Sequence, residues 1–525
     1  DHKRIALDVG GGLTNSVAGR VNVVSEDSDS YRDGVSVRRN GISPTVTLKP
    51  SDRTKVILSA EYFNDLRVTD RGIPSQNGKP FKTDESTFFG NAEQSPTETT
   101  VRTLAATIEH KFKNGVMLSN KTRYADYDKY YQNVYANGSV SAGGMVALAA
   151  YRDDTQRQNL FNQTDLVMTA ETGAIKHQVL LGTEFGRQDS DNFRINGTVA
   201  ASPVSATNPV GVATFAATRA RDSSAQIDVA AVYLQDQLTF NKQWQLVLGL
   251  RQDRFVTDFK DKVPAPDDSA KTTDTELSPR AALIFKPIDA VSIYASYSKS
   301  FVPRAGDQLS SLTNKTAGLE PEAFINKELG AKWDINPDLS VSAALYRLER
   351  ENIAIVINSA GDSALLDGQV VKGAELSLAG KLTAKWSVVG GYSYADSTIK
   401  DDVVTKVTAG APPTITYAAR AGNETSQTPR HTFSLWNRYD LSDRYGVALG
   451  FVSRSSMFAL DDNTVKLPGY GRVDAAAFYN ASKNLQLQLN IENLLNRDYY
   501  VNAHNNNNIT PGSPIAARLS ATYKF

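Results

Sequence analysis

The sequence predicts an all-β fold, a large transmembrane antiparallel β-barrel. Three observations lead to this prediction. Apolar and polar residues alternate with a period of two, short turns alternate with long connections, and the chain ends in an amphipathic segment. A barrel averages lipid-facing apolar residues with lumen-facing polar ones, and it therefore has a hydrophilic composition. The mean hydropathy of −0.35 over 525 residues is thus compatible with a membrane location.

The clearest alternation lies close to the C-terminus. One face carries Leu485, Leu487, Leu489 and Ile491, and the other carries Gln486, Gln488, Asn490 and Glu492. The same period recurs in the segments that begin at Lys55, Leu246 and Val291. Because the polar faces carry small, amide and charged residues strand after strand, they offer no second apolar layer for a β-sandwich core. A wide barrel fits better, with lipid on the apolar face and water on the polar face.

Two kinds of connection alternate between the predicted strands. The short ones are rich in turn-forming residues, and they occupy residues 14–16, 49–53, 113–115, 172–174, 241–243, 286–289, 336–338, 382–385, 442–444 and 481–483. The long ones are polar, and examples cover residues 69–98, 136–155, 196–223, 260–274, 300–318 and 400–427. Outer-membrane barrels show this asymmetry, with short periplasmic turns and long extracellular loops. We therefore expect the short turns to face the periplasm.

Aromatic residues mark the ends of several predicted strands. Tyr294 and Tyr297 are one such pair, and these residues predict girdles at the membrane interfaces. The alternative is that Tyr and Phe simply favour strands. The chain ends in an alternating segment from Leu519 to Phe525. An amphipathic last strand with a terminal Phe resembles the assembly signal of bacterial outer-membrane barrels.

Composition argues against several classes of function. The 57 basic residues balance 57 acidic ones, so that no net charge attracts nucleic acid. The absence of Cys excludes disulfides, thiolate metal sites and thiol nucleophiles. The five His residues belong to no recognisable motif, and we expect no enzyme activity, catalytic residue, metal site or cofactor. No apolar run is long enough for a transmembrane helix.

An ordered set of short motifs runs along the chain. They are Glu26 to Asp33, Gly318 to Glu322 with Lys327 to Trp333, Val371 to Leu376 with Trp386 to Tyr394, Thr428 to Phe433, and Leu467 to Tyr470 with Asn490 to Tyr500. Together they resemble the barrel domain of TonB-dependent outer-membrane siderophore receptors, particularly the catecholate type. The resemblance covers essentially the whole chain, 1–525, as one barrel domain of about 22 strands in the bacterial outer membrane.

The resemblance also implies a function and partners. It implies a receptor that binds a ferric siderophore and imports it with energy from the TonB–ExbB–ExbD complex. A monomer in contact with outer-membrane lipid and lipopolysaccharide is expected. The family's TonB box and plug domain have no counterpart here, because the strand pattern begins directly after Asp1. We therefore expect the plug and the TonB box to be absent from this chain.

The first hairpin is too short for the family's strand count. An even number of strands requires two strands before the turn at 14–16. Only Arg4 to Gly12 is available for both, and this is about the length of one membrane strand of nine to eleven residues. We predict that residues are absent between Val9 and Leu13. Gly10-Gly11-Gly12 should then coincide with a chain break, a distorted seam or an odd strand count.

Ferric catecholates are anionic and carry flat aromatic rings, so that a receptor needs cations and aromatic side chains above its pore. Residues of these types cluster on the predicted outward side, and the candidates are Arg71, Phe88, Phe89, Tyr127, Tyr130, Tyr131, Phe301, Arg304 and Tyr500. For each of them, a girdle aromatic or an ordinary loop charge is the alternative. For the whole chain, the alternatives are a passive channel, a receptor for haem, cobalamin or another large chelate, and a structural or adhesive barrel.

Overall fold

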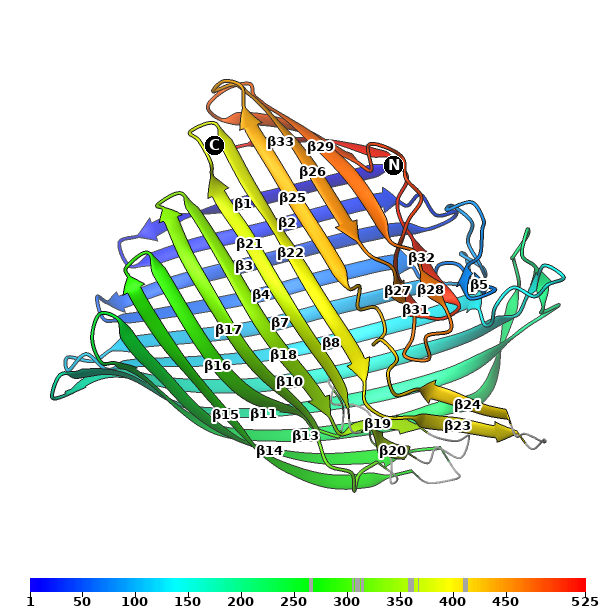
Figure 1. The fold of residues 1–525 in the computed structure, drawn as a ribbon, viewed down its shortest axis with the longest axis horizontal. Helices are drawn as coiled ribbons and strands as arrows, with labels where there is room; N and C mark the ends of the chain where they lie inside the picture. The colour runs from blue at the N-terminus through cyan, green and yellow to red at the C-terminus, as the bar shows by residue number, and fades with distance from the viewer. Residues whose placement is uncertain are drawn as a thin grey trace.

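The computed structural model describes residues 1–263, 268–304, 306, 312, 316–356, 363–366, 368–408 and 414–525. It is a nearly closed antiparallel barrel whose wall consists of 21 strands. Tight turns follow one rim and long connections follow the other (Figure 1). The predicted fold class is confirmed. Within the described residues, no helix is long and apolar enough to cross a membrane.

Each strand of the wall pairs with the next one along the wall. These strands are β1 (His2–Thr14), β2 (Val17–Asp29), β3 (Ser36–Ser51), β4 (Thr54–Val68), β7 (Pro96–Lys111), β8 (Met117–Ala136), β10 (Leu148–Thr172), β11 (Ile175–Val199), β13 (Ala213–Thr239), β14 (Trp244–Asp261), β15 (Ala270–Ile288), β16 (Val291–Val302), β17 (Glu322–Asn336), β18 (Leu339–Glu351), β21 (Gln369–Lys381), β22 (Trp386–Ile399), β25 (His431–Asp440), β26 (Tyr445–Arg454), β29 (Tyr470–Asn480), β30 (Leu485–Glu492) and β33 (Ala516–Tyr523). The predicted short turns all join neighbouring wall strands.

Short hairpins decorate the rim of long connections. They are built from β5 (Ser75–Gln76), β6 (Lys79–Pro80), β9 (Met145–Val146), β12 (Val204–Ser205), β19 (Ile353–Val356), β20 (Ser363–Leu366), β23 (Val403–Thr408), β24 (Thr414–Ala419), β27 (Met457–Phe458), β28 (Lys466–Leu467), β31 (Tyr500–Asn505) and β32 (Asn508–Pro511). Parts of the predicted loops 260–274, 300–318 and 400–427 lie outside the described residues.

The register places large apolar side chains on one face of the wall. Leu489 of β30 lies opposite Leu519 of β33, and these side chains are 38% and 72% exposed. On the opposite face, Gln488 lies opposite Ser520. A continuous face of exposed aliphatic residues is stable only against lipid, so that the polar face lines the lumen.

Several strands are longer than the sequence pattern indicated. β10 and β11 have 25 residues each and β13 has 27, whereas a strand needs about nine to eleven residues to cross a membrane. The predicted loops 136–155 and 196–223 were therefore too long, because their outer parts continue the strands of the wall. This extension places polar strand residues above the membrane, where they line the mouth of the barrel.

Tyr294 has a different role from the predicted membrane girdle. It donates a hydrogen bond to Glu328 on the lumen face, and its ring covers Gly330 of the neighbouring strand. A Cβ at Gly330 would lie 2.4 Å from the ring carbon Cζ of Tyr294. Glycine is therefore required there for packing, not for an unusual backbone angle.

We expect Gly330→Ala to lower the free energy of unfolding of the barrel by about 1–3 kcal/mol, because overpacking forces side chains out of their rotamers. Urea unfolding, followed by the heat-dependent mobility shift of folded barrels on gels, measures this change. Gly11→Ala is the control, because a Cβ at Gly11 meets nothing within 4 Å. Equal unfolding midpoints for the two variants would show that the Tyr294 ring moves aside freely.

The first hairpin is continuous through its glycines. β1 is one strand, in which Gly10, Gly11 and Gly12 lie opposite Arg20, Gly19 and Ala18 of β2. The wall has the odd strand count that was expected, and among the described pairings no ladder joins β1 to β33. The register of β1 against β2 also shifts between Gly12 and Thr14, although the chain is not broken at the glycines. That residues are absent between Val9 and Leu13 stays a prediction.

A small hydrophobic core lies within the long connections at the outer rim. Its buried residues come from loops far apart in the sequence and are Ile73, Phe89, Ala136, Val140, Val146, Ala206, Met457, Ala459, Val465, Leu467, Ala503 and Ile509. The backbone amides of Ile73 and Ile509 donate to each other's carbonyl oxygens, at 2.7 and 2.9 Å. The connection between β30 and β33 is thereby fixed to the connection after β4. We call these residues the loop core.

Candidate ligand-binding site

A cavity of about 610 Å³ lies beside the loop core, at the rim of long connections. One wall comes from the segment after β4 and from the outer ends of β8 and β10, and the other comes from the hairpin β31–β32. Its lining residues are Thr69, Asp70, Arg71, Lys129, Tyr131, Tyr151, Asp153, Thr155, Gln427, Asn502, Ala503, His504, Asn508 and Thr510. Polar and aromatic groups therefore dominate the cavity.

Arg71 lies in a cage of tyrosines. Its guanidinium carbon lies 5.7, 5.4 and 5.7 Å from the ring centroids of Tyr131, Tyr135 and Tyr151. Its Nε donates to the hydroxyl of Tyr131 at 3.0 Å, and its Nη2 donates to that of Tyr151. Tyr131 and Tyr151 stack with centroids 5.5 Å apart. These contacts hold the guanidinium through neutral groups and leave its charge uncompensated.

The carboxylates of the cavity are paired with other cations. Asp153 accepts hydrogen bonds from Arg194, with Nε to Oδ1 at 2.6 Å. Asp70 accepts from Arg32, which is 4% exposed, with Nε to Oδ2 at 2.6 Å. Within the described part of the chain, no carboxylate lies within 4.0 Å of the Arg71 guanidinium. The positive charge of Arg71 is therefore available to a ligand.

The strand register brings the tyrosines together. Tyr131 of β8 lies opposite Asp153 of β10, so that both side chains point to the same side of the wall. Tyr151 comes two residues before Asp153 in β10 and points the same way. Burial raises the pKa of Tyr151 above its ordinary value, with Tyr131 as a further cause. The hydroxyl therefore remains protonated at neutral pH.

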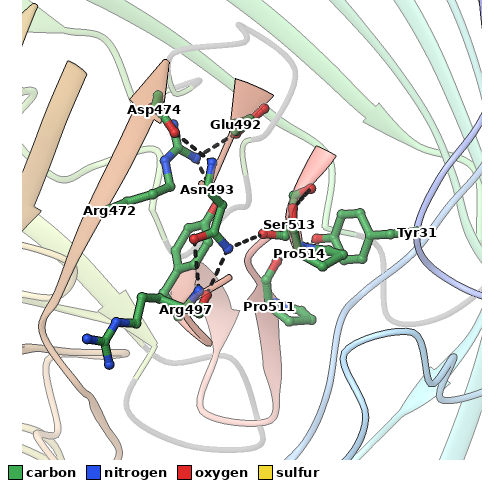
Figure 2. A network of polar contacts seen from close by, with 10 residues as sticks. Tyr31, Arg472, Asp474, Glu492, Asn493, Arg497, Pro511, Ser513 and Pro514 are labelled. Atoms are coloured by element: carbon green, nitrogen blue, oxygen red, sulfur yellow. Dashed lines mark hydrogen bonds and ion pairs between the residues drawn. The ribbon is translucent and has the colours of Figure 1, made fainter. Parts of the chain in front are cut away.

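A polar network anchors the connection that carries the second wall (Figure 2). Arg472 donates to Glu492 at 2.6 Å, to Tyr499 at 2.7 Å and to Asp474 at 2.9 Å. Asn493 is fully buried with a φ of 52°, and its side-chain amide donates to the carbonyl oxygens of residues 497 and 513 at 2.9 Å. The network thus ties both ends of the connection to β29 and β30 and fixes the position of β31 and β32.

His504 of β31 faces the same cavity, and its pKa is shifted. Burial lowers the pKa of His504, and the nearby Arg71 guanidinium lowers it further. The unfolded chain therefore binds this proton more readily than the folded chain does. Its contribution to folding stability is consequently most favourable above the ordinary histidine pKa of about 6.5 and decreases as the pH falls below it.

We expect the His504 imidazole to titrate below the range of an exposed histidine. In Arg71→Gln, its pKa should rise part of the way back, because burial remains. NMR titration of protein labelled at histidine Cε1 measures both values, and His504→Gln identifies the resonance. An unchanged pKa in Arg71→Gln would mean that the guanidinium does not act on this ring.

The structure brings some of the predicted site residues together. Arg71 and Tyr131 line the cavity. Tyr127 points to the same side of β8 as Tyr131 and Lys129. It lies two residues further from the rim than Lys129 does. Tyr130 is on the opposite face of β8, where the Arg152 guanidinium lies 5.2 Å from its ring centroid. The prediction grouped Tyr130 with Tyr131 because they are neighbours in the sequence. Neighbouring residues of a strand point to opposite faces of the sheet, so that the two tyrosines lie on different sides of the wall.

Other predicted residues have packing roles or lie elsewhere. Phe89 is 2% exposed inside the loop core, Phe88 is 8% exposed, and Tyr500 packs against the same core. Phe301 lies near the end of β16 and Arg304 follows this strand, and neither residue lines the cavity. Arg304 instead donates to the carbonyl oxygen of Asn352 at 2.8 Å.

Sequence reasoning missed Tyr151, Asp153, Arg194 and His504. The first two fell within the predicted loop 136–155, because residues 151–155 are polar on both faces of the strand and show no alternation of apolar and polar side chains. No sequence signal placed them beside Tyr131. His504 was interpreted as a structural or surface histidine, and no local pattern relates it to Arg71.

The sequence profile of the family described as TonB dependent receptor-like, beta-barrel, matches residues 41–494. The chain belongs to this family. Its members are outer-membrane proteins, and this localisation agrees with the exposed aliphatic face of the barrel. Among the described residues, no group of three or more His, Asp or Glu side chains is arranged to hold a metal ion.

Individual members of the TonB-dependent receptor family are similar over most of their length. The probable TonB-dependent siderophore receptor PiuA of Acinetobacter baumannii is 27% identical, over 100% of this chain and 75% of the relative. Its crystal structure superposes with a TM-score of 0.90, covering 100% of this chain and 80% of that one. The catecholate siderophore receptor Fiu of Escherichia coli K12 is 26% identical, over 100% of this chain and 74% of the relative.

Proposed function

We propose that this chain is the barrel domain, 1–525, of a receptor that binds a ferric siderophore at the cavity around Arg71, with a preference for catecholates. The observation that supports this most is the uncompensated guanidinium within three tyrosine rings. A ferric catecholate is an anion with aromatic rings, and it would gain charge-assisted hydrogen bonds and ring contacts there.

The second cation and the remaining wall support the same ligand class. The Lys129 ammonium lies 5.5 Å from the centroid of Tyr131, so that two cations share one aromatic surface. Asn502 and Asn508 supply amide groups from the facing hairpin. PiuA is named as a probable TonB-dependent siderophore receptor and Fiu as a catecholate siderophore receptor, and this agrees with the proposal.

Transport by this receptor would require no covalent chemistry and no cofactor. We propose that the TonB–ExbB–ExbD complex supplies the energy, that outer-membrane lipid surrounds the apolar face, and that the barrel acts as a monomer. Loop residues would capture the ligand at the rim, and opening of the lumen would let it pass. A passive channel would need no ligand selectivity at this cavity, which makes binding the decisive measurement.

We expect the receptor in detergent micelles to bind a ferric tris-catecholate at least tenfold more tightly than a ferric hydroxamate or haem. The expected difference follows from the cation and ring contacts around Arg71, each worth about 0.5–2 kcal/mol. Fluorescence titration with the three ligands measures it. Preference for haem, for which tyrosine or histidine could be an axial ligand, would contradict the catecholate proposal, and no binding would favour the channel.

A further inference from the structure

A row of cations crosses three neighbouring strands on the lipid-facing side of the barrel. Lys327 of β17 lies opposite Arg347 of β18, and Arg347 lies opposite Lys372 of β21. Like charges directly opposite each other destabilise a sheet unless something compensates them. Among the other described strand pairs, charged residues that lie directly opposite each other on this face have opposite signs. Arg102 lies opposite Asp126, for example, with Nη1 to Oδ1 at 2.8 Å.

The row lies at the outer edge of the apolar surface. On the same face, Leu329 follows Lys327 by two residues and Leu345 precedes Arg347 by two, and these leucines are 53% and 60% exposed. The segment from Lys327 to Asn336, where the short turn begins, has about the length of one membrane-spanning strand. The cations therefore lie where the lipid headgroups of the outer leaflet begin.

The protein compensates this charge only in part. Three cations share the carboxylate of Glu349, with distances of 2.7 Å to Arg347, 3.5 Å to Lys327 and 3.8 Å to Lys400. Asp396 lies opposite Lys372 but pairs with Arg430 at 3.3 Å. Within the described residues, Lys372 has no carboxylate within 4.0 Å.

We propose that Lys327, Arg347 and Lys372 bind a phosphate group of outer-leaflet lipopolysaccharide. Strands are about 4.8 Å apart, so that adjacent cations in the row are close enough to share one phosphate. The acyl chains of the same lipid would cover Leu329 and Leu345 directly below. This site is on the opposite face of the wall from the cavity around Arg71 and is independent of the proposed ligand.

The test uses the full chain in nonionic detergent with purified lipid A, with and without its phosphates. Native mass spectrometry counts bound lipid for wild type, for Lys327→Gln/Lys372→Gln, and for the control Arg102→Gln/Arg187→Gln. The control cations lie on the same outer face but pair with Asp126 and Asp228. We expect at least tenfold weaker binding of phosphorylated lipid A by the test variant and an unchanged affinity in the control.

Stability gives a second, independent measurement. Without lipid, the test variant should unfold at a higher temperature than wild type, because like charges have been removed. Equal binding of lipid A without phosphates would overturn the proposal, as would equal loss in the control variant. Competition by inorganic phosphate at the concentration of the lipid would show a site for free phosphate and overturn it too. A test variant that fails to fold is replaced by Lys372→Gln, for which the same outcomes hold.

Discussion

Replacing Arg71 with glutamine is expected to weaken ferric-catecholate binding by about a hundredfold. Truncating one partner of a buried charged contact costs about 2–5 kcal/mol, and each 1.4 kcal/mol corresponds to about a factor of ten in affinity. We expect Arg71 to carry the largest share because its hydrogen bonds go to tyrosine hydroxyls, and because none of the described carboxylates lies within 4.0 Å of it. Fluorescence titration of the variant with ferric tris-catecholate measures the loss.

The matched control is Arg304→Gln. Arg304 was an equal candidate from the sequence, but it does not line the cavity, and its guanidinium donates to the carbonyl oxygen of Asn352. We expect its affinity to stay within about twofold of wild type. Comparable losses in both variants would mean that overall charge, and not the tyrosine cage, attracts the ligand. Thermal unfolding of both variants establishes that the barrel remains intact.

The wall of the barrel was predictable because its signals are local. Alternation within one strand decides which residues face lipid, as for Leu485 to Ile491, and turn chemistry decides where strands reverse. The absolute strand length was less predictable. Above the membrane, strands such as β10 carry polar residues on both faces. Apolar and polar side chains therefore no longer alternate along the strand. The segment around Tyr151 therefore resembled a loop.

The site was less predictable because it depends on contacts between distant segments. Arg71 and Tyr131 were recognisable by residue type, but their meeting with His504 requires the connection after β30 to cross to the connection after β4. Phe89 had the right residue type for a ligand contact, yet it packs in the loop core at 2% exposure. Composition identifies the kinds of group available, whereas the tertiary fold decides which of them remain accessible.

The contact that brings the two walls of the cavity together depends on Gly72. This residue lies between Arg71 and Ile73 with a φ of +76°, and an added Cβ would lie 2.0 Å from the carbonyl oxygen of Ile509. Because the obstacle is backbone, no change of rotamer relieves it. The left-handed backbone adds about 1–2 kcal/mol for any residue with a Cβ.

We therefore expect Gly72→Ala to separate the hairpin β31–β32 from the segment that carries Arg71. Both backbone hydrogen bonds between Ile73 and Ile509 would be lost, at about 1 kcal/mol each. Ligand affinity should fall at least tenfold, and limited proteolysis should cut between residues 494 and 515, while the unfolding temperature of the barrel stays nearly constant. Gly143→Ala is the control, since its Cβ would come no closer than 3.9 Å to the Oγ of Ser141. Wild-type affinity and protease resistance in Gly72→Ala would show that the cavity does not need this contact, and the hairpin would then have no part in holding the ligand.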